Sequence, residues 1–216
     1  MTRKGYELAY HFLNVDMTAG HGNEPPWERG EERHFAGKLA MCERGYHSSP
    51  TWLHALPYAP GPVACIVEIG GAIKRDTDKA VSQKRKLLRY RNVERELRLF
   101  ACDCAERALR HERKRGREPD KRSWEAVRVA RRFADGLATS EELAAARDAA
   151  YAARDATRDA TRDAAYAAYA AYAARDAADA AYAARDAAYA AIAAEIKWQR
   201  ARLDKYMAAA FARRAR

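Results

Sequence analysis

The sequence predicts an α+β fold, in which a small N-terminal α+β module over residues 1–90 is followed by a mainly α-helical, Ala-rich bundle over residues 91–216. Three observations lead to this prediction. Most of the Gly and Pro lie before residue 90, beside a short β-branched stretch. From residue 92 the apolar residues recur at three- to five-residue steps, as in an amphipathic helix. Between residues 144 and 194, 29 of 51 residues are Ala, the strongest helix former.

The N-terminal module is predicted to be built around strands. YELAYHFL, residues 6–13, alternates in part and fits a strand. Residues 18–38 contain four Gly and an adjacent pair of Pro, which is typical of a loop. ACIVEIGG, residues 64–71, is the clearest strand and should end at its two Gly. KRKLLRYR, residues 84–91, fits either a further strand or the entry to the first long helix.

Capping signals predict where the helices begin and end. Ser49, followed by Pro, is expected to cap a short helix. A long amphipathic helix should start near residue 92, and Asp120 should cap the next one, which Gly136 should end. The sequence from Thr139 to Glu142 is a capping box, which marks a further helix start.

The Ala-rich segment, residues 144–194, is expected to form the close-packed centre of the helical bundle. Its Tyr, Arg and Asp residues are spaced mostly three apart, as at Tyr166, Tyr169 and Tyr172. Because this spacing is shorter than the roughly 3.6 residues of a helical turn, these side chains would not stay on one face of a straight helix. Either the helix wraps a partner or the segment breaks and folds back. A long solvated helix acting as a spacer is the alternative, and a second copy of the chain is an equally compatible partner.

The positive charge is concentrated in one part of the chain. Residues 79–133 hold 19 Lys and Arg against eight Asp and Glu, a net of +11, while the whole chain carries +10. This favours an acidic protein, a phosphorylated ligand or nucleic acid as a partner, although a solvated surface also explains much of it. The candidate binding residues are the basic side chains Arg85, Arg89, Arg91, Arg95, Arg98, Arg110, Arg113 and Lys114 and the aromatic side chains Tyr166, Tyr169 and Tyr172.

Neither a secretory leader nor a membrane-spanning run of about 18 apolar residues is visible, so a cytoplasmic location is expected. The four Cys are therefore expected to be thiols. Cys102 and Cys104 fall on a predicted helix, where side chains two residues apart point in different directions and cannot share a metal ion.

Two parts of the chain resemble known families. LRLFACDCAERAL followed by WEAVRVARRFADGLATSEELAAARDAAYAARDA, within residues 95–212, resembles the Ala-rich immunity proteins of bacteria and phages. That resemblance implies binding and neutralising a toxin. MCERGYHSSPTWLHALPYAPGPVACIVEIGG, within residues 4–90, resembles a phage-associated domain of unknown function with a C-x-x-G-[FY]-H motif, carried by Cys42, Gly45, Tyr46, His47, Glu68 and Gly71.

Candidate chemistry is confined to the N-terminal module. His11, Tyr46, His47 and Glu68 are similar in order to the His–Tyr–Glu arrangement of ADP-ribosyltransferase-like folds, where His and Tyr hold a nicotinamide dinucleotide and Glu orients the ribose. The alternative is that they serve packing in a small sheet. Cys42 and His47, with His34 or His54, are candidate zinc ligands, since zinc needs three or four ligands. Ser48-Ser49 stands where some relatives have a second Cys, which argues against a Cys-based metal site.

These observations favour a non-catalytic immunity or counter-defence protein, located in the host cytoplasm if phage-encoded, that recognises another protein or sequesters a small ligand. No metal, cofactor or membrane contact is expected. The first alternative is an ADP-ribosyltransferase-like or nucleotide-binding activity in the N-terminal module. The second is a nucleic-acid-binding accessory protein that uses residues 79–133 to contact phosphates.

Overall fold

The computed structural model describes residues 3–20, 24–150 and 177–213, and the side chains of these residues except 177–191. The chain divides into two compact units, Met1–Leu97 with Arg200–Arg216, and Arg98–Gln199. Tyr166, Tyr169 and Tyr172 lie outside the described residues. None of the helices in the described ranges is long and apolar enough to cross a membrane.

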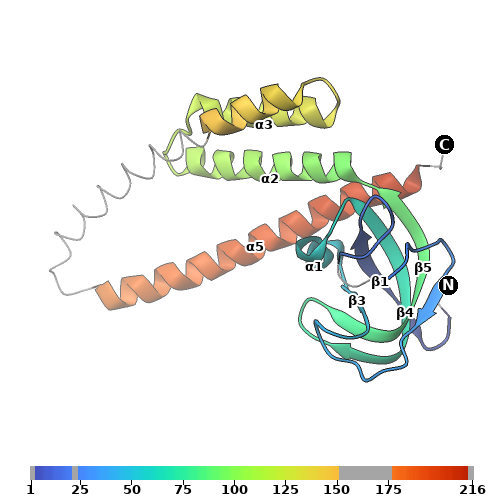
Figure 1. Cartoon of the computed structure of the whole chain (residues 1–216). Helices are drawn as coiled ribbons and strands as arrows, with labels where there is room; N and C mark the ends of the chain where they lie inside the picture. The colour runs from blue at the N-terminus through green and yellow to red at the C-terminus, as the bar shows by residue number, and fades with distance from the viewer. Residues whose placement is uncertain (1–2, 21–23, 151–176, 214–216) are drawn as a thin grey trace. The chain divides into compact units, whose positions relative to one another are not determined.

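The first unit is built on a five-stranded antiparallel sheet (Figure 1). The strands are β1 (Tyr6–Leu13), β2 (Glu32–His34), β3 (Tyr46–Ser48), β4 (Val63–Arg75) and β5 (Ala80–Asn92), with the order β1-β4-β5-β2 and β3 also paired to β5. Between β3 and β4 lie the short helix α1 (Trp52–Ala55) and the 3₁₀ turn η1 (Leu56–Tyr58).

The sheet curls because the pairing of its two long strands, β4 and β5, is irregular and because β1 contacts the end of β3. The β4–β5 register shifts between Ile66 and Val67 and again between Gly70 and Ile73, and such bulges bend a strand. Across the curl, Tyr10 and Ser49 exchange two backbone hydrogen bonds of 2.9 and 2.8 Å. This bridge joins β1 to the end of β3, so the inner face of the sheet becomes concave.

Strand alternation places one set of side chains on this inner face. Ala9, His11 and Leu13 pair with Val67, Cys65 and Val63 in the β1–β4 register, and opposed residues of an antiparallel pair share a face. The apolar members of this row are buried together with Trp27, Tyr46, Ile69 and Leu87. His11 is therefore a polar residue within a row that otherwise forms the core.

The C-terminal turns of helix α5 (Ala177–Ala212) belong to the first unit, where they contact Trp52 and β5. Leu203, Met207, Ala210 and Phe211 are buried and follow the i, i+4, i+7, i+8 spacing of one helix face. Phe211 stacks on Trp52 with ring centroids 5.7 Å apart, and Trp52 packs edge-on against Phe12 of β1.

The second unit is helical. It contains most of α2 (Glu94–Lys114), α3 (Lys121–Ala134), a further helical stretch over residues 140–150, and the described part of α5 before Arg200. Arg131 joins α3 to α2 through Asp103 and Glu106, at 2.7 and 2.6 Å. Arg107 of α2 pairs with Glu195 of α5 at 2.6 Å.

The predicted fold class is wrong, although the chain is α+β overall. The N-terminal part is an antiparallel sheet with only seven residues in α1 and η1, and the described C-terminal part holds a few helices in place of a bundle. The physical reason is that the large apolar side chains of the C-terminus, such as Leu203 and Met207, are buried in the unit that contains the sheet. The Ala-rich stretch before them offers little apolar area for a helical core.

Candidate functional site

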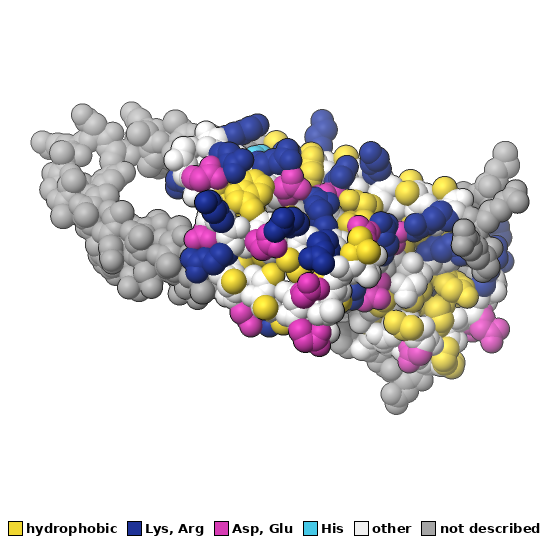
Figure 2. Space-filling model, turned by 90° about the horizontal axis from the view of Figure 1, so that it is seen from above, with side chains coloured by type: hydrophobic (Ala, Val, Ile, Leu, Met, Phe, Trp, Pro, Cys, Tyr) yellow, Lys and Arg dark blue, Asp and Glu magenta, His cyan; other side chains and the backbone are white. Residues whose placement is uncertain are grey.

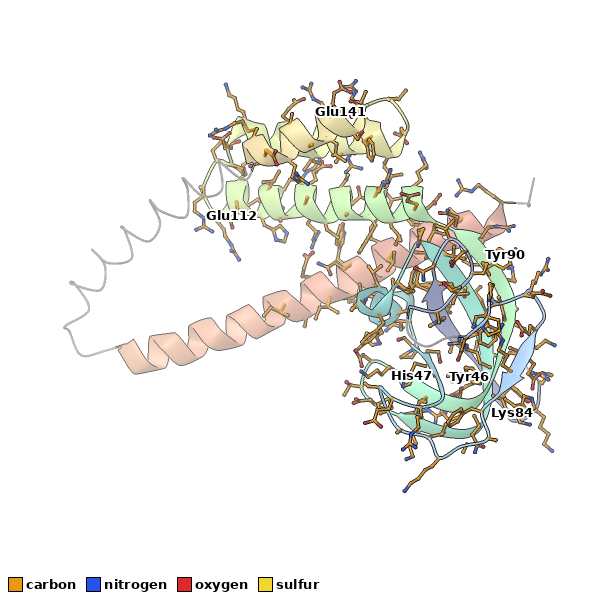
Figure 3. All side chains as sticks on the ribbon, viewed as in Figure 1. Tyr46, His47, Lys84, Tyr90, Glu112 and Glu141 are labelled. Carbon is orange, nitrogen blue, oxygen red and sulfur yellow. The ribbon has the colours of Figure 1, made fainter. Side chains whose placement is uncertain are left out.

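A cavity of about 940 Å³ opens within the first unit, against the concave face of the sheet. Its walls come from β1, the loop after it, residues 42–49, the α1–η1 segment and β5. The lining residues with polar or aromatic side chains are Tyr10, His11, Asn14, Glu24, Phe35, Cys42, Glu43, Arg44, Tyr46, His47, Ser48, Ser49, Tyr58, Lys79 and Arg85. Figure 3 labels Tyr46 and His47 on β3 and Lys84 on β5.

Arg85 supplies a buried positive charge to this cavity. Its side chain is 4% exposed, and its guanidinium lies over the rings of Trp27 and Tyr46, at 4.3 and 5.1 Å from their centroids. Burial lowers its pKa to about 10, partly offset by the negative charge of Glu24, so the group remains charged at neutral pH. Nη1 donates to the carbonyl oxygen of His47 at 2.9 Å, and Nη2 lies 4.0 Å from Glu24.

His11 and Ser48 bring two unsatisfied polar atoms to the same cavity. His11 Nε2 and Ser48 Oγ are buried and have no hydrogen-bond partner among the described residues. Burial, together with the charge of Arg85, holds the pKa of His11 well below 6.5, so its ring is neutral at pH 7. Ser48 is 3% exposed. Because Tyr10 pairs with Ser49 in an antiparallel bridge, His11 stands directly opposite Ser48 across it.

Cys42 and His47 both line the cavity, but their contact is not that of a metal site. Cys42 adopts a positive φ of 64°, and its backbone N–H donates to His47 Nε2 at 2.8 Å. His34 lies elsewhere, 3.2 Å from Glu32, and His54 is on α1. Among the residues that the structure describes, no group of three or more His, Cys, Asp or Glu could hold a metal ion.

Gly45 explains how Tyr46 reaches the inner face. Its φ is +111°, and a Cβ there would lie 2.6 Å from Leu39 and 2.6 Å from Val81. Only Gly fits this position, so the Gly of the C-x-x-G-[FY]-H motif lets β3 lie close to β5. Tyr46 then packs edge-on against Trp27 at 5.6 Å.

Glu68 is separated from the other residues of the ADP-ribosyltransferase-like set. It pairs with Leu8 of β1, three positions from the His11–Cys65 pair, and an odd separation reverses the face of a strand. It is absent from the cavity lining. Its carboxylate lies 3.0 Å from Arg3. The structure therefore brings His11, Tyr46 and His47 to one cavity and leaves Glu68 outside it.

The basic residues at the end of β5 hold the C-terminus of α5. Arg89 donates to the carbonyl oxygen of Phe211 at 2.5 Å, and Arg91 donates to that of Arg213 at 3.1 Å. The last carbonyl groups of a helix lack intrahelical partners, so these two arginines cap α5. Arg95 is exposed near the start of α2. Arg98 lies over the ring of Phe133 at 4.5 Å.

The basic residues of the helical unit are interspersed with acidic ones over α2 and α3 (Figure 2). Arg110 pairs with Glu106, and Arg113 pairs with Glu118 at 2.6 Å. Lys114 is exposed at the end of α2. Exposed pairs of this kind contribute little to stability, and they reduce the positive field that α2 and α3 present.

Sequence reasoning missed several residues that shape the cavity. Ser48, Glu24 and Lys79 line it, and Trp27 lies beneath Arg85. The alternation of β3, which places Tyr46 and Ser48 on one face, is a signal that could have found Ser48. Nothing in the sequence links Glu24 or Lys79 to these residues, because the cavity is closed by pairings between distant segments.

Residues 7–98 match a family described as Domain of unknown function (DUF7666). This agrees with the resemblance of the N-terminal part to a domain of unknown function, and the description names no activity. No curated protein and no solved structure matches the chain. The matched residues include every residue that lines the cavity, so the cavity lies wholly within the matched part of the chain.

Proposed function

We propose that this chain is a non-catalytic binding protein whose first unit sequesters a small anionic ligand in the cavity. The observation that carries the proposal is Arg85, a charged group buried at 4% exposure in the wall of a cavity of about 940 Å³. Burying a charge is costly unless it is matched. The facing carboxylate, Glu24, is 4.0 Å away and 37% exposed, which leaves the charge only partly compensated.

Binding is favoured over catalysis by the disposition of the polar groups. The carboxylate that an ADP-ribosyltransferase-like reaction requires, Glu68, faces away from the cavity and is held by Arg3. His47 Nε2 accepts a backbone hydrogen bond and so has no lone pair left for general base catalysis. Among the described residues, the cavity offers hydrogen-bond donors but no nucleophile hydrogen-bonded to a general base. Such a site is suited to holding an anion.

We further propose that this sequestration serves an immunity or counter-defence role in the cytoplasm of a bacterial cell, as the resemblance to phage-associated and immunity proteins suggests. A protein that removes a small signalling or toxic molecule from solution neutralises it without any reaction. The basic helices α2 and α3 are then available for recognition of a protein partner. Arg110 and Arg113 of α2 are paired with glutamates. This pairing favours a protein partner over nucleic acid for these helices.

The proposal is tested by asking what the purified protein carries. The full chain, an Arg85→Met variant and a Lys84→Met variant are purified from bacterial cells, denatured, and the released small molecules are identified by mass spectrometry. Lys84 is the matched control, because it loses the same charge from the adjacent position of β5, on the opposite face. We expect the unmodified chain and Lys84→Met to release a small anion in near-stoichiometric amount.

Arg85→Met should release about tenfold less, since a hydrogen bond to a charged group contributes roughly 1.5–3 kcal/mol. Circular dichroism reports whether each variant is folded. If Arg85→Met does not fold, Arg85→Lys keeps the charge but loses the planar fork, and its release is compared instead. Release of no small anion by the unmodified chain, or equal release by a folded Arg85 variant, would contradict the proposal.

A further inference from the structure

The polar end of the cavity has the donors for an anion with three terminal oxygens. A guanidinium has five N–H donors, and Arg85 spends one on the His47 carbonyl oxygen. Its planar fork matches two oxygens of a phosphate or a carboxylate. Ser48 Oγ and His11 Nε2 are buried without partners in the described part of the chain, so they add a hydroxyl and an imidazole to the guanidinium.

The arrangement of these three groups favours a phosphate over a carboxylate. His11 and Ser48 oppose each other across the β1–β3 bridge, which places their Cβ atoms about 5 Å apart. Arg85 is close enough for its charge to lower the pKa of His11, and it binds the carbonyl oxygen of the residue before Ser48. A phosphate monoester can turn a separate terminal oxygen toward each of the three groups, whereas a carboxylate has only two oxygens to share among them.

The cavity also has aromatic walls. Tyr58 of η1 lines it and is 48% exposed. Its hydroxyl donates to Asp78 at 2.6 Å, and Lys79 Nζ lies 4.7 Å from its ring centroid, so the ring is fixed in place. A tyrosine ring held in this way can stack against a planar base. Tyr10 and Phe35 add further aromatic surface.

The volume also exceeds what a phosphate needs. A cavity of about 940 Å³ lies at the upper end of the range of roughly 300–1,000 Å³ for sites that bind drug-sized molecules. We infer that the sequestered ligand is a nucleotide, with its phosphate held by Arg85, Ser48 and His11 and its base placed against Tyr58. This inference rests on the proposed function and names the chemical class of the ligand.

The test uses the full chain after exhaustive dialysis and isothermal titration calorimetry. The probes are the four nucleoside 5′-monophosphates, adenosine and ribose 5-phosphate. We expect at least one monophosphate to bind about tenfold or more tightly than either adenosine or ribose 5-phosphate, since each of these lacks one half of the recognised ligand. Ribose 5-phosphate binding as tightly as every monophosphate overturns the inferred base site.

Adenosine binding as tightly as AMP overturns the inferred phosphate site, and binding of none of the probes overturns the inference as a whole. The proposed function is judged separately by the molecule that copurifies with the chain. A released anion without a base, such as a sugar phosphate or a dicarboxylate, would leave sequestration standing while the nucleotide inference fails. If no anion is released but a monophosphate binds tightly, the nucleotide site stands and the proposed sequestration in cells fails.

Two variants and one control locate the two halves of the ligand. Ser48→Ala should weaken monophosphate binding about tenfold and leave the thermal midpoint unchanged or raised, because the hydroxyl has no partner to lose. Tyr58→Leu should reduce binding of the monophosphate to the level of ribose 5-phosphate. Tyr90→Leu, at 39% exposure and outside the cavity lining, should leave it unchanged. Unaltered affinity in Ser48→Ala and Tyr58→Leu would overturn the assignment.

Discussion

At the scale of single residues, Glu32 shows how one side chain makes the stability of the first unit depend on pH. It lies on β2, 2.7 Å from Arg3, and accepts a hydrogen bond from the Tyr6 hydroxyl at 2.8 Å. Partial burial raises its pKa, but the hydrogen bonds from Tyr6, Arg3 and His34 outweigh this and lower the pKa from 4.5 to about 2. Tyr6 reaches it by lying across Gly70, where a Cβ would come within 2.7 Å of the ring.

The lowered pKa predicts a loss of stability in acid. Between pH 4.5 and about 2 the unfolded state binds more protons at this site than the folded state, so the contribution is present above pH 4.5 and is lost as the pH falls. Glu32→Gln should therefore cost about 1–2 kcal/mol near pH 7, after allowance for solvent screening, and much less near pH 2. Urea unfolding at several pH values measures this.

The control for this prediction is Glu28→Gln, which removes the same charge from an exposed position before β2. We expect its free energy of unfolding to differ little from that of the unmodified chain at any pH. A Glu32→Gln variant whose stability runs parallel to that of the unmodified chain from neutral pH to about pH 2 would show that the contacts of Glu32 do not contribute.

At the scale of elements, local capping patterns were predictable and long-range pairings were not. Asp120 caps α3 by accepting from the N–H of Arg122 at 2.8 Å, and Thr139 and Glu142 exchange the two bonds of a capping box, both as expected. The cap of α1 is Thr51 in place of Ser49, because Ser49 is engaged in the bridge to Tyr10. That bridge joins segments 39 residues apart, and no spacing in the sequence indicates it.

The strand at residues 64–71 illustrates the same limit. Its existence was predicted, but β4 continues to Arg75, because a register shift after Gly70 lets the strand bend and pair again with β5. Gly71 has a φ of +72° there, so it bends the strand where it was expected to end it. The cavity depends on this bend and on the bridge between Tyr10 and Ser49. Neither feature could be predicted from the sequence, and so neither could the cavity.

The last turns of α5 are predicted to contribute strongly to the stability of the first unit. Phe211 is 7% exposed and stacks on Trp52, so Phe211→Ala should lower the free energy of unfolding by about 3–5 kcal/mol. Ile196→Ala, on the same helix but 50% exposed, should change it by less than about 0.5 kcal/mol. Chemical denaturation followed by Trp fluorescence measures both. Equal stabilities of the two variants would show that Phe211 is not part of the core.

At the scale of the whole molecule, the matched domain and the folded unit do not coincide. The family match ends at residue 98, whereas the unit that contains the cavity also includes residues 200–216. Leu203 and Met207 are fully buried at 0% and 1% exposure. Glu96, buried at the start of α2, pairs with Arg213. The two ends of the chain therefore contribute to one core, which a sequence analysis that divides the chain at residue 90 does not anticipate.

A fragment of residues 1–98 is consequently expected not to fold by itself. Without α5, Trp52 would lose its stacking partner Phe211, and the apolar surface that packs against Leu203 and Met207 would be exposed to water. This exposure costs about 25 cal/mol per Å² of apolar surface. Near-ultraviolet circular dichroism should show no fixed aromatic environment. Addition of a peptide spanning residues 198–213 should restore the signal, and a peptide in which Leu203, Met207 and Phe211 are replaced by Ala should not. If the fragment alone unfolds cooperatively at the same urea concentration as the full chain, the C-terminal helix is a neighbour of the domain and not a part of its core.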